Sequence, residues 1–264
     1  MNFTVLGSIG TVVEGRFVAI TGARQRILLT TLLLTAGRLL PSEQLYSELW
    51  GENPPESVEN ALQAHVSRLR RTLRLHAGEK MQPPPLIGGP SGYQLLVAPM
   101  DVDVHVFRER LAQARTAVQQ DPSMARDLLE AVLALWRGPL PQELAASPLC
   151  RSAAVQVEED YLTAQESRLE LELRYGAPSD VISELRRLGM MHPWRERITE
   201  LLMLALYRTG RQAEAVETYN AMRARLVGEL GIEPSLRLRE LFRQILNQAP
   251  ALEPLRGMAL SLDE

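Results

Sequence analysis

Short apolar segments and longer helical patterns alternate in the first 97 residues of the chain. Residues 3–9 and 16–20 are rich in Val, Ile and Phe and predict strands of a small antiparallel sheet, separated by Gly10 and Gly15. Apolar residues at three- and four-residue spacing predict three helices, over 23–36, 42–50 and 57–75, with Ser42 and Ser57 as N-caps of the last two. A Gly-rich turn at 88–92 between apolar segments predicts a hairpin. This order predicts an α+β winged helix-turn-helix domain over residues 1–98.

The remainder of the chain shows helical patterns and no convincing strand. Gly and Pro separate seven predicted helices, at 104–119, 123–136, 149–175, 179–189, 194–209, 212–229 and 235–247. Consecutive helices with short links predict antiparallel hairpins, as in tetratricopeptide-like stacks, although no strict 34-residue repeat is visible. We therefore expect an all-α, tetratricopeptide-like domain over 99–250 and a disordered tail over 251–264.

The third predicted helix has two different faces. One is apolar and is expected to pack on the two preceding helices; it contains Val58, Leu62, Val66, Leu69 and Leu73. The opposite stripe contains Asn60, Gln63, Ala64, Ser67, Arg70, Arg71 and Arg74. Asn and Gln pair with adenine and Arg pairs with guanine or phosphate, while Ala leaves room for close approach. The pattern predicts a recognition helix for double-stranded DNA, although a solvated arginine-bearing face would have the same composition.

Other candidate DNA contacts lie outside this helix. Arg24 and Arg26 begin the first predicted helix, and Ser42 and Tyr46 lie in the second; each could contact phosphate or remain a surface residue. The hairpin tip is a candidate wing with backbone amides for phosphate, and its expected contacts are Gly89, Ser91 and Tyr93. The tip could equally be an ordinary turn with a core tyrosine. It lacks Lys and Arg, so no charged insertion into the minor groove is expected.

The charge distribution supports two different halves, although the net charge is only −3. Residues 1–97 hold nine basic and seven acidic side chains, whereas residues 98–264 hold 20 basic and 25 acidic ones. This asymmetry suits one nucleic-acid-facing half and one protein-facing half.

No pattern for catalysis or for a cofactor is visible. The four histidines lack metal-ligand spacing, Cys150 is the sole cysteine, and no HExxH, GxGxxG, GxxxxGK[ST] or GxSxG motif occurs. We expect no enzyme activity, no metal and no cofactor. The N-terminus does not resemble a signal peptide, and the most apolar run, 27–37, is too short for a membrane span, so a cytoplasmic protein acting at the nucleoid is expected.

Several segments together resemble the Streptomyces antibiotic regulatory protein family over about residues 3–247. The first half is similar to an OmpR-type winged helix through LGSI, ARQRILLTTLLLTAG, ELWGENPP, ALQAHVSRLRRTL and GYQL. The second half resembles the bacterial transcriptional activation domain through VDVHVFRERLAQA, LALWRGPL, HPWRERITELLMLALYRTGRQAEAVETY and ELGIEPSLRLREL.

The resemblance implies an activator of secondary-metabolite genes that binds promoter direct repeats as a side-by-side homodimer. It also implies contact with RNA polymerase, including its sigma subunit. The recognition helix carries over to 57–74, which adds Arg68 to the candidate contacts, and the wing carries over to 88–93. OmpR-type wings often have an Arg before the turn; Gly88, Gly89 and Pro90 stand here instead, which puts base contacts by the wing in doubt. A protein-interaction adaptor and a repressor with the same DNA-binding half remain alternatives.

Overall fold

The computed structural model describes residues 1–78, 82–83 and 85–252. These residues form two compact units, Met1–Ala164 and Gln165–Glu264. The first unit contains the predicted winged-helix domain together with helices that the sequence analysis assigned to the second domain. The expectation of a disordered tail concerns residues outside the described part from 253 onward, whereas Pro250–Leu252 form a 3-10 turn, η4.

The chain begins with a three-stranded antiparallel sheet of order β1-β2-β3. Its strands are β1 (Asn2–Thr4), β2 (Gly10–Val13) and β3 (Arg16–Ala19). The prediction of a single strand over 3–9 was wrong, because the chain leaves β1 after Thr4 and Gly10 begins β2. A Cβ added at Gly10 would lie 2.4 Å from a carbon of the Phe17 ring. Glycine at this position therefore allows the ring of β3 to pack against β2.

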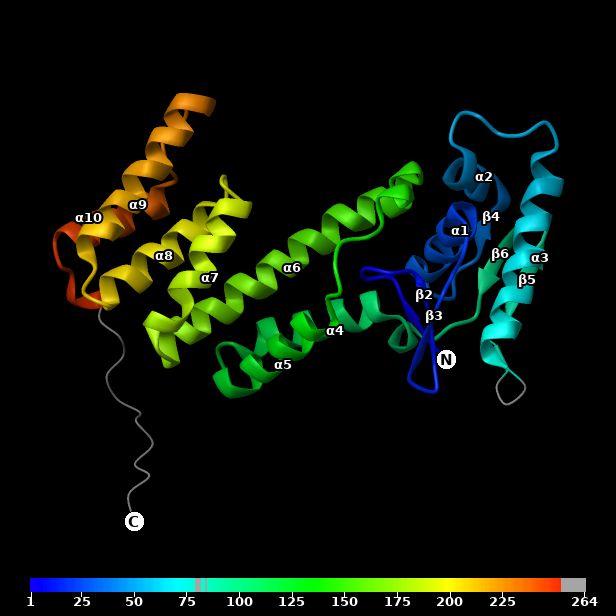
Figure 1. The fold of residues 1–264 in the computed structure, drawn as a ribbon, viewed down its shortest axis with the longest axis horizontal. Helices are drawn as coiled ribbons and strands as arrows, with labels where there is room; N and C mark the ends of the chain where they lie inside the picture. Colours follow the sequence, from blue (N-terminus) through cyan, green and yellow to red (C-terminus); the bar gives the residue numbers. More distant parts are fainter. Residues whose placement is uncertain (79–81, 84, 253–264) are drawn as a thin grey trace, which may run out of the picture. The chain divides into compact units, whose positions relative to one another are not determined.

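Three helices and a second sheet complete the predicted winged-helix fold, which is confirmed (Figure 1). The helices are α1 (Ala23–Leu34), α2 (Ser42–Trp50) and α3 (Val58–Ala77). The sheet has the order β4-β6-β5, with β4 (Leu40–Pro41), β5 (Leu86–Gly89) and β6 (Gly92–Leu95). Apolar residues of all three helices and of β6 are buried in the core, among them Leu28, Leu32, Leu45, Leu49, Leu62, Leu69 and Leu95.

Of the two predicted serine N-caps, the position of Ser57 is confirmed and that of Ser42 was wrong. Ser42 is the first residue of α2, and Pro41 occupies the N-cap position without a side-chain bond. Ser57 does occupy the N-cap position of α3, yet its hydroxyl accepts no hydrogen bond from the helix. The short strand β4 was not predicted, because two residues pairing with Gly92 and Tyr93 carry no sequence pattern of their own.

Four further elements follow within the first unit. They are the 3-10 turns η1 (Pro99–Asp101) and η2 (Gln142–Ala146) and the helices α4 (Asp103–Ala117) and α5 (Pro122–Leu135). Asp121 caps α5 by accepting the Met124 N–H at 3.0 Å. The long helix α6 (Pro148–Tyr175) begins in the first unit and ends in the second.

Two buried carboxylates join the winged helix to these later helices of the first unit. Asp103 accepts the backbone N–H groups of Val5 and Leu6 at 2.8 and 3.2 Å and pairs with Arg137. Burial raises the pKa of Asp103, although these donors oppose the rise. Glu48 of α2 accepts the Ser147 hydroxyl and, at 3.0 Å, the Leu149 N–H, so it caps the start of α6.

The second unit is entirely helical in its described part. It holds α7 (Pro178–Met191), α8 (Glu196–Arg208), α9 (Gln212–Arg225), a π turn η3 (Leu226–Leu230) and α10 (Leu236–Leu246). Ala205 of α8 and Ala215 of α9 are both fully buried in the core of this unit. Tyr219 stacks on Phe242 with ring centroids 3.9 Å apart. The all-α, tetratricopeptide-like prediction is confirmed.

Candidate nucleic-acid interface

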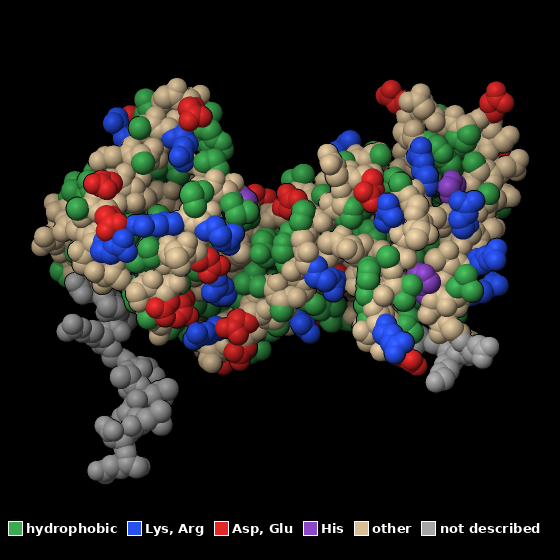
Figure 2. Space-filling view, viewed as in Figure 1, with side chains coloured by type: hydrophobic (Ala, Val, Ile, Leu, Met, Phe, Trp, Pro, Cys, Tyr) green, Lys and Arg blue, Asp and Glu red, His purple; other side chains and the backbone are tan. Residues whose placement is uncertain are grey.

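The two faces of α3 separate as the sequence predicted, except that Val58 and Arg70 are both half-buried. Leu62, Val66, Leu69 and Leu73 are buried against the core. The opposite stripe is exposed over the length of the helix at Asn60, Gln63, Ala64, Ser67, Arg68, Arg71 and Arg74. Figure 2 shows basic side chains gathered over α3 along one edge of the winged-helix domain. The surface is amide-bearing in its first half and cationic in its second.

Arg70 differs from the other arginines of α3. Its side chain is half-buried, and its Nε donates to the Leu86 carbonyl of β5 at 2.8 Å. Arg70 therefore ties the recognition helix to the wing hairpin. Its remaining guanidinium N–H groups are the part that could reach DNA.

The candidates on α1 have different surroundings. Arg24 is exposed, and its guanidinium lies 5.9 Å from the centre of the Trp50 ring, within the range of a cation–π contact. Arg26 pairs with Glu143 of η2 at 2.6 Å and also donates to the Ile20 carbonyl. Arg26 is therefore partly exposed and is engaged in contacts inside the first unit.

The candidates on α2 lie where α2, α3 and the hairpin tip meet. Ser42, Tyr46 and Gln63 line a small hollow together with Pro90 and Tyr93. Ser42 is buried and its backbone N–H donates to the Ser91 carbonyl at 3.4 Å, so its position fixes the hairpin. Tyr46 is half-exposed, and burial together with nearby Glu59 raises the pKa of its hydroxyl, which therefore stays protonated and able to donate.

The wing is a hairpin with a two-residue turn, Pro90–Ser91, between β5 and β6. Ser91 is exposed and Gly89 is half-exposed, so both are accessible from solvent. Tyr93 is only 4% exposed and pairs with Leu40 in the sheet, so the expectation of a DNA contact by its side chain is corrected to a core position.

Sequence reasoning also missed why glycine stands at position 88. Gly88 has a φ of 125°, and an added Cβ would lie 2.2 Å from the Gly92 carbonyl oxygen. Glycine at this position permits strand pairing. At Gly89 an added Cβ would meet nothing within 4 Å, which leaves the tip open.

A polar contact between α1 and α3 helps to position α3. The sequence did not predict this contact. The buried Gln25 of α1 donates to His65, with 3.0 Å between its Nε2 and the ring Nδ1 and 3.2 Å to the His65 carbonyl. The His65 ring lies 5.9 Å from that of Trp50. Burial lowers the pKa of His65, and the nearby Arg68 and Arg24 lower it further, so the ring is neutral at neutral pH. His65 is therefore a packing residue of α3.

The comparisons with known proteins agree with this architecture. Residues 18–82 match the model described as "Transcriptional regulatory protein, C terminal", and residues 102–246 match "Bacterial transcriptional activator domain". The chain is 37% identical to the transcriptional regulator RedD of Streptomyces coelicolor, over 96% of this chain and 72% of RedD. It belongs to the Streptomyces antibiotic regulatory protein family.

Other members of the family extend the similarity. The regulatory protein DnrI of Streptomyces peucetius is 33% identical, over 96% of this chain and 94% of DnrI. A structure of Mycobacterium tuberculosis EmbR in complex with a low-affinity phosphopeptide superimposes with a TM-score of 0.85 and 31% identity. That match covers 96% of this chain and 66% of the EmbR chain. The protein is accordingly a DNA-binding transcriptional regulator, and its family is not one of enzymes.

Two further findings concern the described residues alone. Within them, no group of three or more His, Cys, Asp or Glu side chains could hold a metal ion. None of the helices in the described ranges is both long and apolar enough to cross a membrane.

Proposed function

We propose that this regulator activates transcription by placing α3 in the major groove of promoter direct repeats and by recruiting RNA polymerase. The observation that carries the proposal is the exposed stripe of α3 from Asn60 to Arg74, opposite the buried residues Leu62, Val66, Leu69 and Leu73. The major groove of B-form DNA admits one α-helix, and base edges there present distinct donor and acceptor patterns.

The two halves of the stripe divide the work of recognition. Asn60 and Gln63 are exposed amides suited to paired hydrogen bonds with adenine. Arg71 and Arg74 are exposed cations suited to guanine or to phosphate, and Arg68 extends the cationic surface. Ala64 and Ser67 are small, so the helix can approach the base edges closely. The wing contributes backbone groups at Gly89 and Ser91, without a cation.

The second part of the proposal concerns partners. We propose that this protein binds DNA as a side-by-side homodimer and contacts the sigma subunit of RNA polymerase. We also propose that it controls an antibiotic or other secondary-metabolite gene cluster. The support is its membership of the family and the match of residues 102–246 to the activator domain. The same membership supports action on chromosomal DNA in the cytoplasm.

Footprinting on the DNA upstream of the neighbouring genes, with and without RNA polymerase, tests the proposal. We expect protection of two direct repeats by the protein alone and an extended, stronger footprint when polymerase is added. Run-off transcription from the same fragment should rise with protein concentration. Protection without any gain in polymerase binding, together with a fall in transcript, would instead establish a repressor. Absence of protection on any upstream fragment would favour a protein-interaction adaptor.

A further inference from the structure

The second compact unit contains a pocket of about 350 Å³ that the DNA interface does not use. Its walls come from the end of α6, from α8 and α10, and from η4. Leu173 and Leu201 are buried in its floor, and Leu204 and Leu241 are partly buried beside them. The volume is near the lower end of the range of roughly 300–1,000 Å³ in which proteins bind small molecules.

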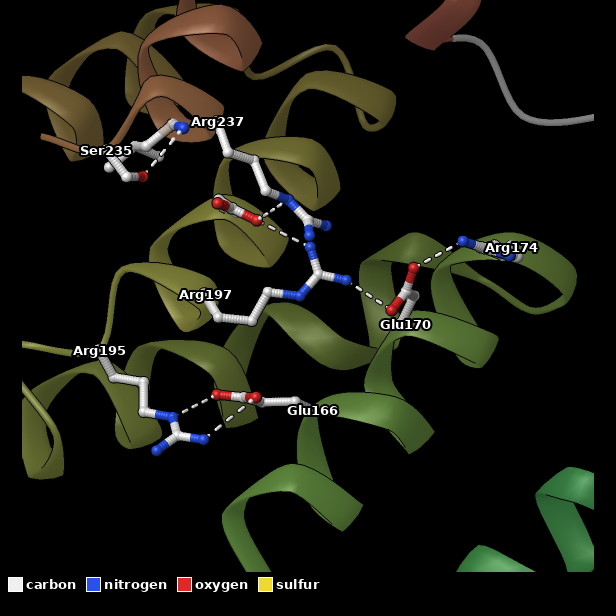
Figure 3. Close-up of polar contacts among 9 residues, drawn as sticks. Glu166, Glu170, Arg174, Arg195, Arg197, Ser235 and Arg237 are labelled. Atoms are coloured by element: carbon white, nitrogen blue, oxygen red, sulfur yellow. Dashed lines mark hydrogen bonds and ion pairs between the residues drawn. The ribbon is translucent and has the colours of Figure 1, made fainter. Parts of the chain in front are cut away.

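A chain of ion pairs crosses the rim of this pocket (Figure 3). Arg174 donates to Glu170 at 2.6 Å, and Glu170 also accepts from Arg197. Arg197 then donates to Glu200 at 2.8 Å, and Glu200 also forms an ion pair with Nε of Arg237, with 2.8 Å between the two atoms. These ion pairs link α6, α8 and α10 and hold the arginine side chains in position.

The carboxylates of the pocket are already occupied by these and neighbouring donors. The Glu200 side chain is 7% exposed and forms ion pairs with two arginines. Burial would raise the pKa of Glu170, but Arg197 and Arg174 outweigh it and lower that pKa. Glu240 accepts from Arg243 and Gln244, which lower its pKa to about 2. Each of the three carboxylates is already paired with at least one arginine of the described residues.

The arginines keep donors for a ligand. Among the described residues, Arg237 is paired only through Nε, and its side chain is 67% exposed. Within the same ranges, Arg174 donates through one terminal nitrogen alone, and its side chain is 48% exposed. Arg208 adds a fourth cation, held on the floor by the Leu173 and Leu252 carbonyls. The lining therefore has four arginines against three glutamates.

We infer that this pocket binds a small amphipathic organic anion. A carboxylate or phosphate group would accept from Arg237 and Arg174, for which the planar guanidinium fork is well suited. A short apolar body would cover the leucines of the floor. Such a ligand would contact α6, α8, α10 and η4 at once and would stabilise their arrangement, because a ligand that binds only the folded form raises its stability. The second unit would thereby hold an effector site.

Octanoate is a suitable probe because it combines one carboxylate with an apolar chain. We would titrate octanoate into the full-length protein and follow the leucine methyl resonances by NMR. Acetate and 1-octanol, which each carry one of the two features of octanoate, are the control compounds. We expect saturable shifts with octanoate and much weaker effects of acetate, which lacks the chain, and of octanol, which lacks the charge. No saturable shift with octanoate at millimolar concentration would overturn the inference, and so would equal binding of octanol.

Matched variants locate the site. Arg237→Gln and, separately, Arg174→Gln should weaken octanoate binding about tenfold or more, since each removes a charged donor. Arg239→Gln is the control, because Arg239 is exposed on α10 and does not line the pocket. All three variants should keep wild-type DNA affinity. If both pocket variants bound octanoate with wild-type affinity, the proposed site would be overturned. The ion pairs would then have a structural role only.

Discussion

Arg70 and Arg71 are neighbours on α3 with different surroundings. Arg71 is exposed, whereas Arg70 donates to the Leu86 carbonyl and links α3 to the wing. We expect Arg70→Ala to lower the free energy of unfolding by about 1 kcal/mol, because the substitution removes that hydrogen bond. Urea denaturation followed by circular dichroism would measure this, with Arg71→Ala as the control of unchanged stability. Equal unfolding midpoints for the two variants would contradict the structural role of Arg70.

At the residue scale, the sequence predicted positions on one element better than partners between elements. The helical period alone separates Asn60 and Gln63 from Leu62, because side-chain direction on a helix follows from spacing. The sequence left Arg26 as a candidate phosphate contact. Its ion-pair partner, Glu143, could not be recognised because it lies 117 residues further along the chain. Tyr93 was likewise ambiguous, because an aromatic after a turn suits either a surface or a core.

The wing hairpin depends on one glycine more than on its neighbour. Gly88 has a positive φ and no space for a Cβ, whereas Gly89 has space. Gly88→Ala should destabilise the domain by about 1–3 kcal/mol, the usual cost of a strained backbone position, and Gly89→Ala should cost much less. Thermal unfolding of the two variants under one condition would compare them. A Gly89→Ala protein less stable than Gly88→Ala would refute this description of the hairpin.

Elements bounded by Gly or Pro were predictable in type and nearly in extent. The helix predicted over 42–50 has those bounds in the structure, where Gly51 follows it. The strands β2 and β4 could not be predicted in the same way. They have only four and two residues, respectively, and strands this short take their conformation from the partner strand. The cap at the start of α6 was also hidden, because its acceptor is Glu48 on a distant helix rather than a local side chain.

At the scale of the whole molecule, Glu48 links the helix-turn-helix to the start of α6. Glu48→Gln replaces a buried acceptor of two donors by an amide, so we expect a loss of about 1–3 kcal/mol in the free energy of unfolding. Glu43→Gln on the exposed side of α2 is the control and should change stability by less than about 0.5 kcal/mol. Denaturant titration would distinguish them. Equal stabilities would show that the Glu48 contact does not hold these segments together.

The ion-pair chain of the second unit makes its stability depend on acid pH. The pKa of Glu170 is lowered in the folded protein, so its contribution is complete above the ordinary glutamate value of about 4.3 and is lost as the pH falls through the folded value. The melting temperature of the wild type should therefore exceed that of Glu170→Gln at pH 7, and the difference should shrink below about pH 4. Glu217→Gln, at an exposed position of α9, should show no such pH-dependent difference. A difference independent of pH would contradict the assignment.

The central claim is that the exposed stripe of α3 contacts DNA, and the salt dependence of binding tests it most directly. Fluorescence anisotropy on a promoter fragment would compare wild type, Arg71→Ala and the control Arg16→Ala, an exposed position on β3, over a range of salt concentrations. If Arg71 contacts phosphate, Arg71→Ala should weaken binding and reduce the slope of log affinity against log salt by about 1, with unchanged thermal stability. Arg16→Ala should behave as wild type. An Arg71→Ala protein with wild-type affinity and slope would contradict the account.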